Sequence, residues 1–503
     1  MLDIPPEIWH YIASFVPDEE LCHLLGVNSV FFAIAMDLRW KEVSIMTRNT
    51  SEAMRILKRL SDPFIANRLQ RLVLRLTHVK ERNTTGSQES AKDFKHLRQQ
   101  FHLTINRVFK VFRKDHSSPE ADLSNDFTKP LGRPTFSDVI SSIISASPHF
   151  RNIHDLTIDS WDLPPSYDLK DLFTAIWSSF GANLCRLSLG GNLEGYRVLI
   201  ESQPNLEKLR EFHVEFTNNL FRVDNDMDVK ILVELVAPFI NRLNGNLHSL
   251  RVWSWANLDL SAFFARLEVL PVLEYLNIRM AFNKALTNPA GLKNLLCGCS
   301  TTLQRLDLRL NPAGLPMNPV WEEPLSLWLT ECLADERCFA HLRQLDIYPT
   351  NKQVGMDFLQ SCIHRTSKTL THLTVRDRYF QPTELVLVVD SAATCAELKS
   401  LRLNVWRLDA TLFDLLAKKV PEIRMLWLSV GEALSNNDHG GLGHTFLQEL
   451  KQRSYANWKL KDISIWQGGQ EVDDDTMLAL ARSIPSLSSF FGTGHMRTNS
   501  FDH

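Results

Sequence analysis

The chain is expected to fold as an α/β protein in which short parallel strands alternate with helices along one curved axis. Three observations predict this class. An apolar pattern, L-x-x-L-x-L with Ile, Val or Phe at some positions, returns twelve times along the 503 residues. The segments between these units carry apolar residues at the three- and four-residue spacing of one helix face. The chain is also too long for one ordinary core, which favours several domains or a repeat array.

The twelve units recur at a spacing that chance does not explain. After the first unit, the middle residues lie 25 to 39 positions apart, with one gap of 84. We interpret each unit as a strand followed by a helix, and strands that all run the same way form a parallel sheet. The units are Leu69-Leu72-Leu74, Ile153-Leu156-Ile158, Leu184-Leu187-Leu189, Leu209-Phe212-Val214, Leu247-Leu250-Val252, Leu273-Leu276-Ile278, Leu303-Leu306-Leu308, Leu342-Leu345-Ile347, Leu370-Leu373-Val375, Leu398-Leu401-Leu403, Ile423-Leu426-Leu428 and Leu460-Ile463-Ile465.

This repeat resembles the leucine-rich-repeat horseshoe, in an irregular form that lacks the Asn that regular versions place after the third Leu. The resemblance covers about residues 69–490 and implies an irregular solenoid, with a parallel-strand sheet on its concave face and helices on its convex face. We therefore expect a connecting helix or linker over 48–68, the horseshoe over 69–490 and a tail over 491–503.

A polar, turn-rich insert interrupts the array at about residues 80–135 and accounts for the long gap. Its middle, "KDFKHLRQQFHLTINRVFKVFRK", combines an apolar helical stripe with basic residues on the other faces. The favoured interpretation is a helix packed on the flank of the horseshoe. A contact with an anionic membrane or nucleic acid and a partner-docking helix are the alternatives.

The first forty residues predict three short helices that are too small to enclose their own apolar side chains. Pro5 and Pro6 introduce the first helix, an acidic break follows at Asp18, and two further apolar segments end at Trp40. Some of this apolar surface must therefore be covered by the array, by residues 48–68 or by another protein.

This N-terminal pattern resembles the F-box, through "I-P-P-E-I", the "D-E-E-L" break, "L-L-x-V" and the closing "L-R-W". Where the family often has C-R-x-W, this chain has "N-S-V-F-F", which keeps the aromatic bulk and loses the basic residue. The resemblance gives a helical domain over 1–47 and implies that it binds the Skp-type adaptor of cullin-based ubiquitin ligases. The residues implied on or behind the adaptor face are Ile4, Pro5, Glu7, Ile8, Ile12, Leu21, Leu24, Val27 and Phe31.

An F-box followed by leucine-rich repeats is the order of modules of SCF-type substrate receptors. The resemblance thus implies a substrate-recognition subunit that binds a target protein on its concave repeat face and is not itself an enzyme. The alternative is a leucine-rich-repeat scaffold whose F-box-like segment only caps the array.

The concave face is predicted from the alternation of side chains along a strand. If Leu250 and Val252 point into the core, then Arg251, Trp253 and Trp255 point outward. Trp, Tyr and Arg dominate binding hot spots, and clustered arginines suit an acidic or phosphorylated segment, although these rings could also simply cover the exposed sheet. The predicted target-binding residues are Arg251, Trp253, Trp255, Arg279, Arg309, Tyr348, Arg376, Arg378, Arg402, Trp406 and Trp427, with Trp161 and Trp466 at further outward positions.

No catalytic, metal or cofactor motif is predicted. The loop with Asp438, His439 and His444 misses both phosphate-binding glycine spacings, and Cys297 and Cys299 have no nearby His. The eight cysteines show no paired C-x-x-C spacing and are interpreted as reduced core residues. The net charge of −3 gives no global case for nucleic-acid binding. With no apolar run long enough to span a membrane, the expected location is cytoplasmic or nuclear.

Overall fold

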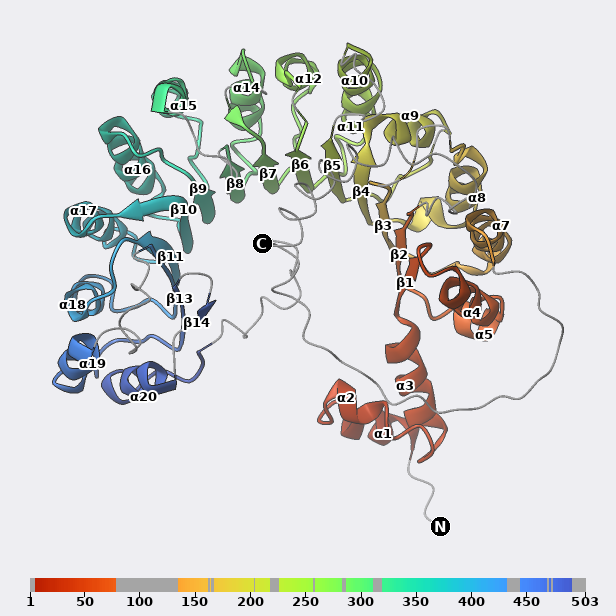
Figure 1. Cartoon of the computed structure of the whole chain (residues 1–503), viewed down its shortest axis with the longest axis horizontal. Coiled ribbons are helices and arrows are strands. Elements are labelled where there is room, and N and C mark those ends of the chain that lie inside the picture. Colours follow the sequence, from red (N-terminus) through yellow and green to blue (C-terminus); the bar gives the residue numbers. More distant parts are fainter. Residues whose placement is uncertain are drawn as a thin grey trace, which may run out of the picture.

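The computed structural model shows an α/β chain that curves into an open arc, with strands on the inside and helices on the outside (Figure 1). Among the described residues, no pairing joins the first strand of the sheet to the last, so the arc is compatible with a solenoid-like horseshoe. The structure describes residues 5–77, 134–161, 163, 167–202, 204–217, 226–256, 258–282, 286–310, 319–431, 444–467, 470–471 and 474–490.

In the described part of the chain, fourteen strands form a single sheet in which the spatial order is the sequence order. Pairing is parallel from the first strand to the thirteenth, and the last strand pairs antiparallel. The strands are β1 (Glu42–Met46), β2 (Arg71–Arg75), β3 (Asp155–Asp159), β4 (Arg186–Asn192), β5 (Glu211–Thr217), β6 (Ser249–Ser254), β7 (Tyr275–Arg279), β8 (Arg305–Arg309), β9 (Gln344–Ile347), β10 (His372–Phe380), β11 (Ser400–Val405), β12 (Met425–Val430), β13 (Asp462–Gln467) and β14 (Gln470–Glu471).

Helices connect successive strands and cover the outer side of the sheet (Figure 1). Three of them precede β1 and form the N-terminal segment. The helices are α1 (Pro6–Ala13), α2 (Asp18–Leu21), α3 (Ser29–Trp40), α4 (Thr50–Leu60), α5 (Pro63–Ala66), α7 (Phe136–Ala146), η2 (Ser147–His149), α8 (Lys170–Phe180), η3 (Gly181–Asn183), α9 (Leu193–Glu201), α10 (Asp226–Lys230), η4 (Ile231–Val236), α11 (Ala237–Arg242), α12 (Ser261–Arg266), α14 (Ala290–Gly298), α15 (Pro319–Ala334), α16 (Gln353–Thr366), α17 (Pro382–Ala392), α18 (Ala410–Lys419), α19 (His444–Lys451) and α20 (Asp474–Ser483).

The repeated leucines build the core between the sheet and the helices. Leu250, Leu276 and Leu306 occupy the same register on adjacent strands, and each is fully buried. Removing such side chains from water is worth about 1.5 to 3 kcal/mol each, so the stacked rows hold neighbouring repeats together. All twelve predicted strands are present as β2 to β13.

The sheet begins earlier than the predicted array, because β1 precedes residue 69 and pairs with β2. Trp40, Val43 and Ile45 keep the spacing of the repeat, with a Trp at its first position, and all three are buried. The insert at about residues 80–135 lies outside the described residues, except for its last two positions. The sheet continues across it, since Leu72 of β2 pairs in register with Leu156 of β3.

Candidate functional site

The helix α1 is apolar on two opposite sides. One side packs inward, where Ala13 is buried and Trp9 contacts the ring of Phe31 edge-on at a centroid distance of 5.6 Å. The other side leaves Ile8 48% and Tyr11 65% exposed to solvent. Phe15, one turn further on, is also exposed and contacts Tyr11. The segment therefore presents an exposed apolar surface, which makes it a candidate for contact with another molecule.

The residues implied as an adaptor face separate into exposed positions and supporting positions. Ile8, Ile12 and Val27 are exposed, whereas Leu21 and Phe31 are buried in a small core formed by the N-terminal helices. Leu24 is partly buried against the same core. Pro5, which is the N-cap residue of α1, and Glu7, which lies in the first turn, are both exposed. Ile4 lies outside the described residues.

The helix α3 joins this small core to the main one. Phe31, near its start, belongs to the N-terminal core, and Trp40, at its end, belongs to the core of the arc. Arg68 strengthens the junction by an ion pair with Asp37 of α3 and by stacking 4.5 Å from the centroid of the Phe64 ring. The N-terminal helices are thus attached through packed contacts as well as through the chain.

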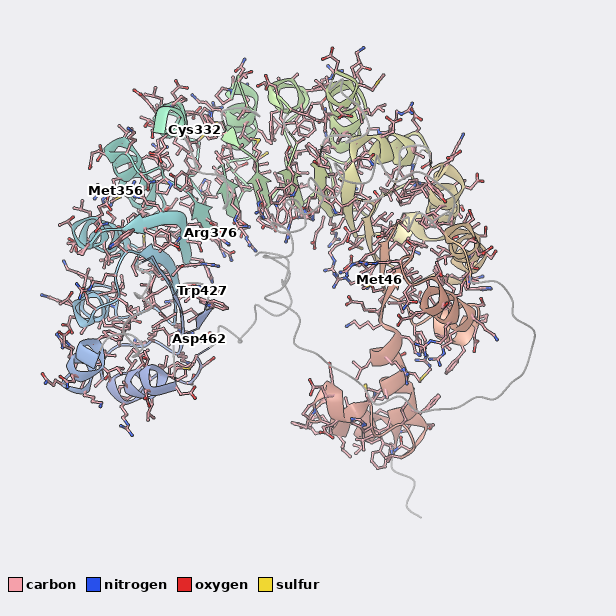
Figure 2. The ribbon with its side chains drawn as sticks, in the orientation of Figure 1. Met46, Cys332, Met356, Arg376, Trp427 and Asp462 are labelled. Atoms are coloured by element: carbon pink, nitrogen blue, oxygen red, sulfur yellow. A yellow bond between two sulfur atoms is a disulfide. The ribbon has the colours of Figure 1, made fainter. Side chains whose placement is uncertain are left out.

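The concave face consists of three rows of side chains, from the first, third and fifth residues of the strands. Figure 2 shows Arg376 and Trp427 on this inner side, whereas Met356 lies in the helix layer. Charge divides the rows into two regions. The acidic end lies on β1–β5 and consists of Glu42, Asp155, Asp159, Glu211 and Glu215, with Arg71, Arg75 and Arg186. The basic centre lies on β6–β11 and consists of Arg251, Arg279, Arg305, Arg309, Arg376 and Arg402, with Asp307 and Asp346.

Several arginines of the basic centre lie over aromatic rings. The guanidinium of Arg279 is 4.4 Å from the centroid of Trp255 and 5.3 Å from that of Trp253. Arg251 lies 5.1 Å from the ring of Tyr275, and Arg402 lies over Trp427. A guanidinium held over a ring keeps its charge and presents its edge to solvent, so these residues form a cationic surface with fixed geometry.

Two acidic residues of the basic centre reduce its charge. Asp307 accepts hydrogen bonds from Tyr275 at 2.6 Å and Asn277 at 3.1 Å, and Arg305 lies 3.2 Å from it. Asp346 forms an ion pair with Arg376, and both side chains are largely buried. Arg309 is different, because its side chain makes no hydrogen bond or ion pair to any residue that the structure describes. It is therefore the arginine most available to a ligand.

The acidic end contains two carboxyl groups with unusual titration. Burial raises the pKa of Glu215 to about 7, although the indole of Trp255 donates a hydrogen bond to it at 2.7 Å. Burial also raises the pKa of Asp159, against the attraction of Arg75 at 3.7 Å. Asp159 of β3 and Glu215 of β5 both pair in register with Gly190 of β4. Because glycine has no side chain, β4 places no side chain between the two carboxyl groups.

Two predicted target-binding residues do not lie on the concave surface. Tyr348 is buried in the main core and donates a hydrogen bond to Glu322 of α15 at 2.8 Å. Strand β9 ends at Ile347 and the chain then turns, with Thr350 at a φ of 74°, so the alternation of faces no longer applies. Arg378 is 2% exposed and pairs with Glu384, because β10 shifts register between Val375 and Tyr379.

The remaining predicted rings differ in accessibility. Trp253 lies on the concave side but is covered, since it contacts His213 and donates to Asn277 at 2.8 Å. Trp255 and Trp406 are 43% and 46% exposed. Trp427 stacks on Trp466 of the next strand with ring centroids 6.4 Å apart, while Trp161 is partly buried.

The sequence prediction missed the acidic members of the concave face and the apolar surface at Tyr11. Asp307 and Asp346 stand in the same register positions as Arg251, so the alternation rule would have placed them there. Tyr11 is three residues after Ile8 on α1, a spacing that puts both on one face of a helix. Both signals were present in the sequence pattern.

Burial makes several cysteine thiols poor nucleophiles. Burial raises the pKa of Cys299, and raises those of Cys332 and Cys362 to about 12, so these thiols stay protonated at neutral pH. Cys297 forms a disulfide with Cys338, which corrects the prediction that every cysteine is reduced. The spacing of 41 residues concealed this pair, and the fold brings the two Cα atoms to 4.8 Å.

Asp438 and His439 of the glycine-rich loop lie outside the described residues, and His444 begins α19. Within the described part of the chain, no three His, Cys, Asp or Glu side chains gather in a way that could hold a metal ion. No helix there is both long and apolar enough to cross a membrane.

No protein-family model matches the chain, and no curated protein matches it.

Proposed function

We propose that this protein is a substrate receptor of a cullin-based ubiquitin ligase. The N-terminal helices would bind the Skp-type adaptor, and through it cullin, and the concave face would bind the target protein. Such a receptor works without chemistry of its own, because holding the target near a charged ubiquitin carrier raises their effective concentration. The observation that carries the proposal is the exposed apolar side of α1, with Ile8, Tyr11 and Phe15.

The distribution of charge on the concave face favours a negatively charged target segment. Six arginines and two aspartates occupy the concave positions of β6–β11, whereas three arginines and five acidic residues occupy those of β1–β5. We therefore expect an acidic or phosphorylated segment of the target to bind to the basic centre, with Arg309 and Arg279 as its main contacts. Arg376 contributes less, because Asp346 already pairs with it.

The alternative is a scaffold in which the N-terminal helices only cap the array. The contacts of α3 bear on this choice. Trp40 at the end of α3 and Leu57 of α4 are buried in the main core beside the first strand. The exposed side of α1 does not help to cover the first strand. A segment that served only as a cap would have no need of this exposed apolar side, so its presence favours the receptor over the scaffold.

The experiment is binding of the whole chain to purified Skp-type adaptor, followed by size-exclusion chromatography. Ile8→Asp with Tyr11→Asp should abolish the complex, because each apolar side chain buried in an interface is worth about 1.5 to 3 kcal/mol. Leu327→Asp with Val354→Asp is the matched control, since both are exposed apolar residues on the outer helices α15 and α16. Absence of a complex with the unmodified chain would favour the scaffold.

A further inference from the structure

A pocket of about 420 Å³ opens at the edge of the sheet where the middle strands begin. Glu274, Gln304 and Arg343 each stand directly before β7, β8 and β9. Because these strands are parallel, the three side chains meet at the same edge. Their backbones also form a ladder, in which the N–H of each residue donates to the carbonyl of the preceding one, from His248 to Arg343, at 2.7 to 2.9 Å.

The lining of this rim pocket is rich in hydrogen-bond donors without a partner. The side chains of Arg343, His341, Gln304 and Thr301 are exposed and make no hydrogen bond or ion pair to any residue in the described part of the chain. A guanidinium offers five N–H groups in a planar fork, and the amide of a glutamine offers two more. These donors come from the loops before β8 and β9, so one ligand can reach all of them.

The one carboxylate of the lining is already engaged. Oε1 of Glu274 lies 3.1 Å from Nδ1 of His248, at the far side of the row from Arg343. Arg343 is the lining residue with a fixed positive charge, and it stands two strands away from Glu274. Arg305 and the rest of the basic centre begin one residue further along the strands, which adds positive potential beside the pocket.

Two other ligand classes fit this lining poorly. A metal ion would need several His, Cys, Asp or Glu side chains together, and no such group of three occurs among the described residues. An apolar ligand would find one aliphatic residue, Val272, because every other lining residue carries a polar or charged group. The volume falls within the range of pockets that hold small ligands.

We propose that the rim pocket binds a phosphate monoester carried on a polypeptide, such as a phosphoserine side chain, with the guanidinium of Arg343 as its principal contact. A phosphoryl group supplies several strong acceptor oxygens and nearly two negative charges, which match one arginine surrounded by neutral donors. Inorganic phosphate shares this chemistry. The peptide is favoured because the lining residues come from the loops before successive strands and several of them are exposed, so a polypeptide can lie across the rim.

The test is ³¹P NMR titration of the whole chain with acetyl-Gly-Gly-phosphoserine-Gly-Gly-amide. We expect a saturable shift of the phosphorus resonance with the unmodified chain. The affinity for the peptide should be about tenfold or more lower in Arg343→Glu, because a bidentate charged contact is lost. Arg424→Glu is the matched control. Arg424 is exposed and stands directly before β12, so it has the same rim position in another repeat.

Each outcome bears on the proposal. Equal affinity of Arg343→Glu and the unmodified chain, or no shift with the unmodified chain at millimolar peptide, would overturn it. Inorganic phosphate that binds as tightly as the peptide would make the ligand a free anion, and a peptide with Glu in place of phosphoserine that binds equally well would show recognition of charge alone. Either result overturns the peptide assignment. Adaptor binding by Arg343→Glu, measured in parallel, keeps this test separate from that of the proposed function.

Discussion

The indole N–H of Trp255, directly after β6, donates a hydrogen bond of 2.7 Å to Oε1 of Glu215 on the adjacent strand β5. This bond stabilises the carboxylate, yet burial still raises the pKa of Glu215 from its ordinary value of 4.5 to about 7. The charged form is therefore the unfavourable one in the folded protein. Between about pH 4.5 and pH 7 the folded state binds more protons than the unfolded state, so the free energy of unfolding falls as pH rises.

We expect Glu215→Gln to stabilise the protein at pH 8 and to leave its stability nearly unchanged at pH 4.5. Glutamine has the same shape and can still accept the bond from Trp255, but it carries no charge to desolvate. The gain at pH 8 should be about 1 to 3 kcal/mol, since one pKa unit corresponds to about 1.4 kcal/mol. Thermal unfolding at the two pH values measures it, and an equal effect at both would contradict the titration of Glu215.

Arg376→Glu and Arg309→Glu should differ in stability although both reverse one concave charge. Arg376→Glu leaves the buried Asp346 facing a second carboxylate, which should cost about 3 to 5 kcal/mol. Arg309→Glu breaks no bond to a described residue and should change stability by about 0.5 kcal/mol or less. Chemical denaturation checks both, and a large loss in Arg309→Glu would reveal a contact outside the described residues.

Arg309→Glu should also weaken binding of an oligoglutamate probe to the basic centre. The effect should shrink as salt is raised, because screening acts on exposed charges. Fluorescence anisotropy at two salt concentrations measures it. Arg210→Glu is a suitable control, since Arg210 is exposed on the rim and precedes β5 at the acidic end. Unchanged affinity in Arg309→Glu would remove this surface from the proposed target site.

Replacing residues 80–133 with a short Gly–Ser linker should leave the array folded, with the cooperative thermal transition of the sheet preserved. Loss of that transition would contradict this expectation. The sheet is continuous across the insertion, and Thr135 with Asp138 closes the start of α7 through a reciprocal capping box. The neighbouring repeats thus make their contacts without the insert. A drop of several degrees would support the flank-packing interpretation, and an unchanged midpoint would leave membrane, nucleic-acid and partner docking open.

Gly291→Ala should destabilise the protein, whereas Gly245→Ala should be nearly neutral. A Cβ at Gly291 would lie 2.4 Å from the backbone nitrogen of Ala265, so α14 and α12 would have to move apart. Such overpacking costs about 1 to 3 kcal/mol. At Gly245 a Cβ would meet nothing within 4 Å. Denaturant unfolding of the two variants measures this difference, and similar midpoints would argue against close packing of α12 on α14.

The fold could be predicted where one rule applies to every repeat. Leu69, Leu72 and Leu74 set a spacing that recurs, so twelve strands followed from a single pattern. The strand β1 was missed because Trp40 takes the place of the first leucine. Tryptophan is not among the Leu, Ile, Val and Phe side chains that define the repeat.

The site was less predictable, because it depends on pairs of residues from different repeats. Alternation placed Arg251, Arg279 and Arg309 correctly, and it failed at Tyr348 and Arg378, where the strand ends or shifts register. The pairing of Arg376 with Asp346 depends on strand register over 30 positions of sequence. No local pattern contains that information.

The helix α3 contributes Phe31 to the N-terminal core and Trp40 to the main core, so the two cores can unfold at different temperatures. The N-terminal core has three buried side chains among the described residues, whereas the main core continues along the whole arc. On heating, the N-terminal helices should lose their structure first, while Trp40 still holds the last turn of α3 against β1. A partner bound to α1 would then raise the first transition and leave the second in place, since it stabilises only the unit that it contacts. Calorimetry would therefore resolve adaptor binding from target binding within a single chain.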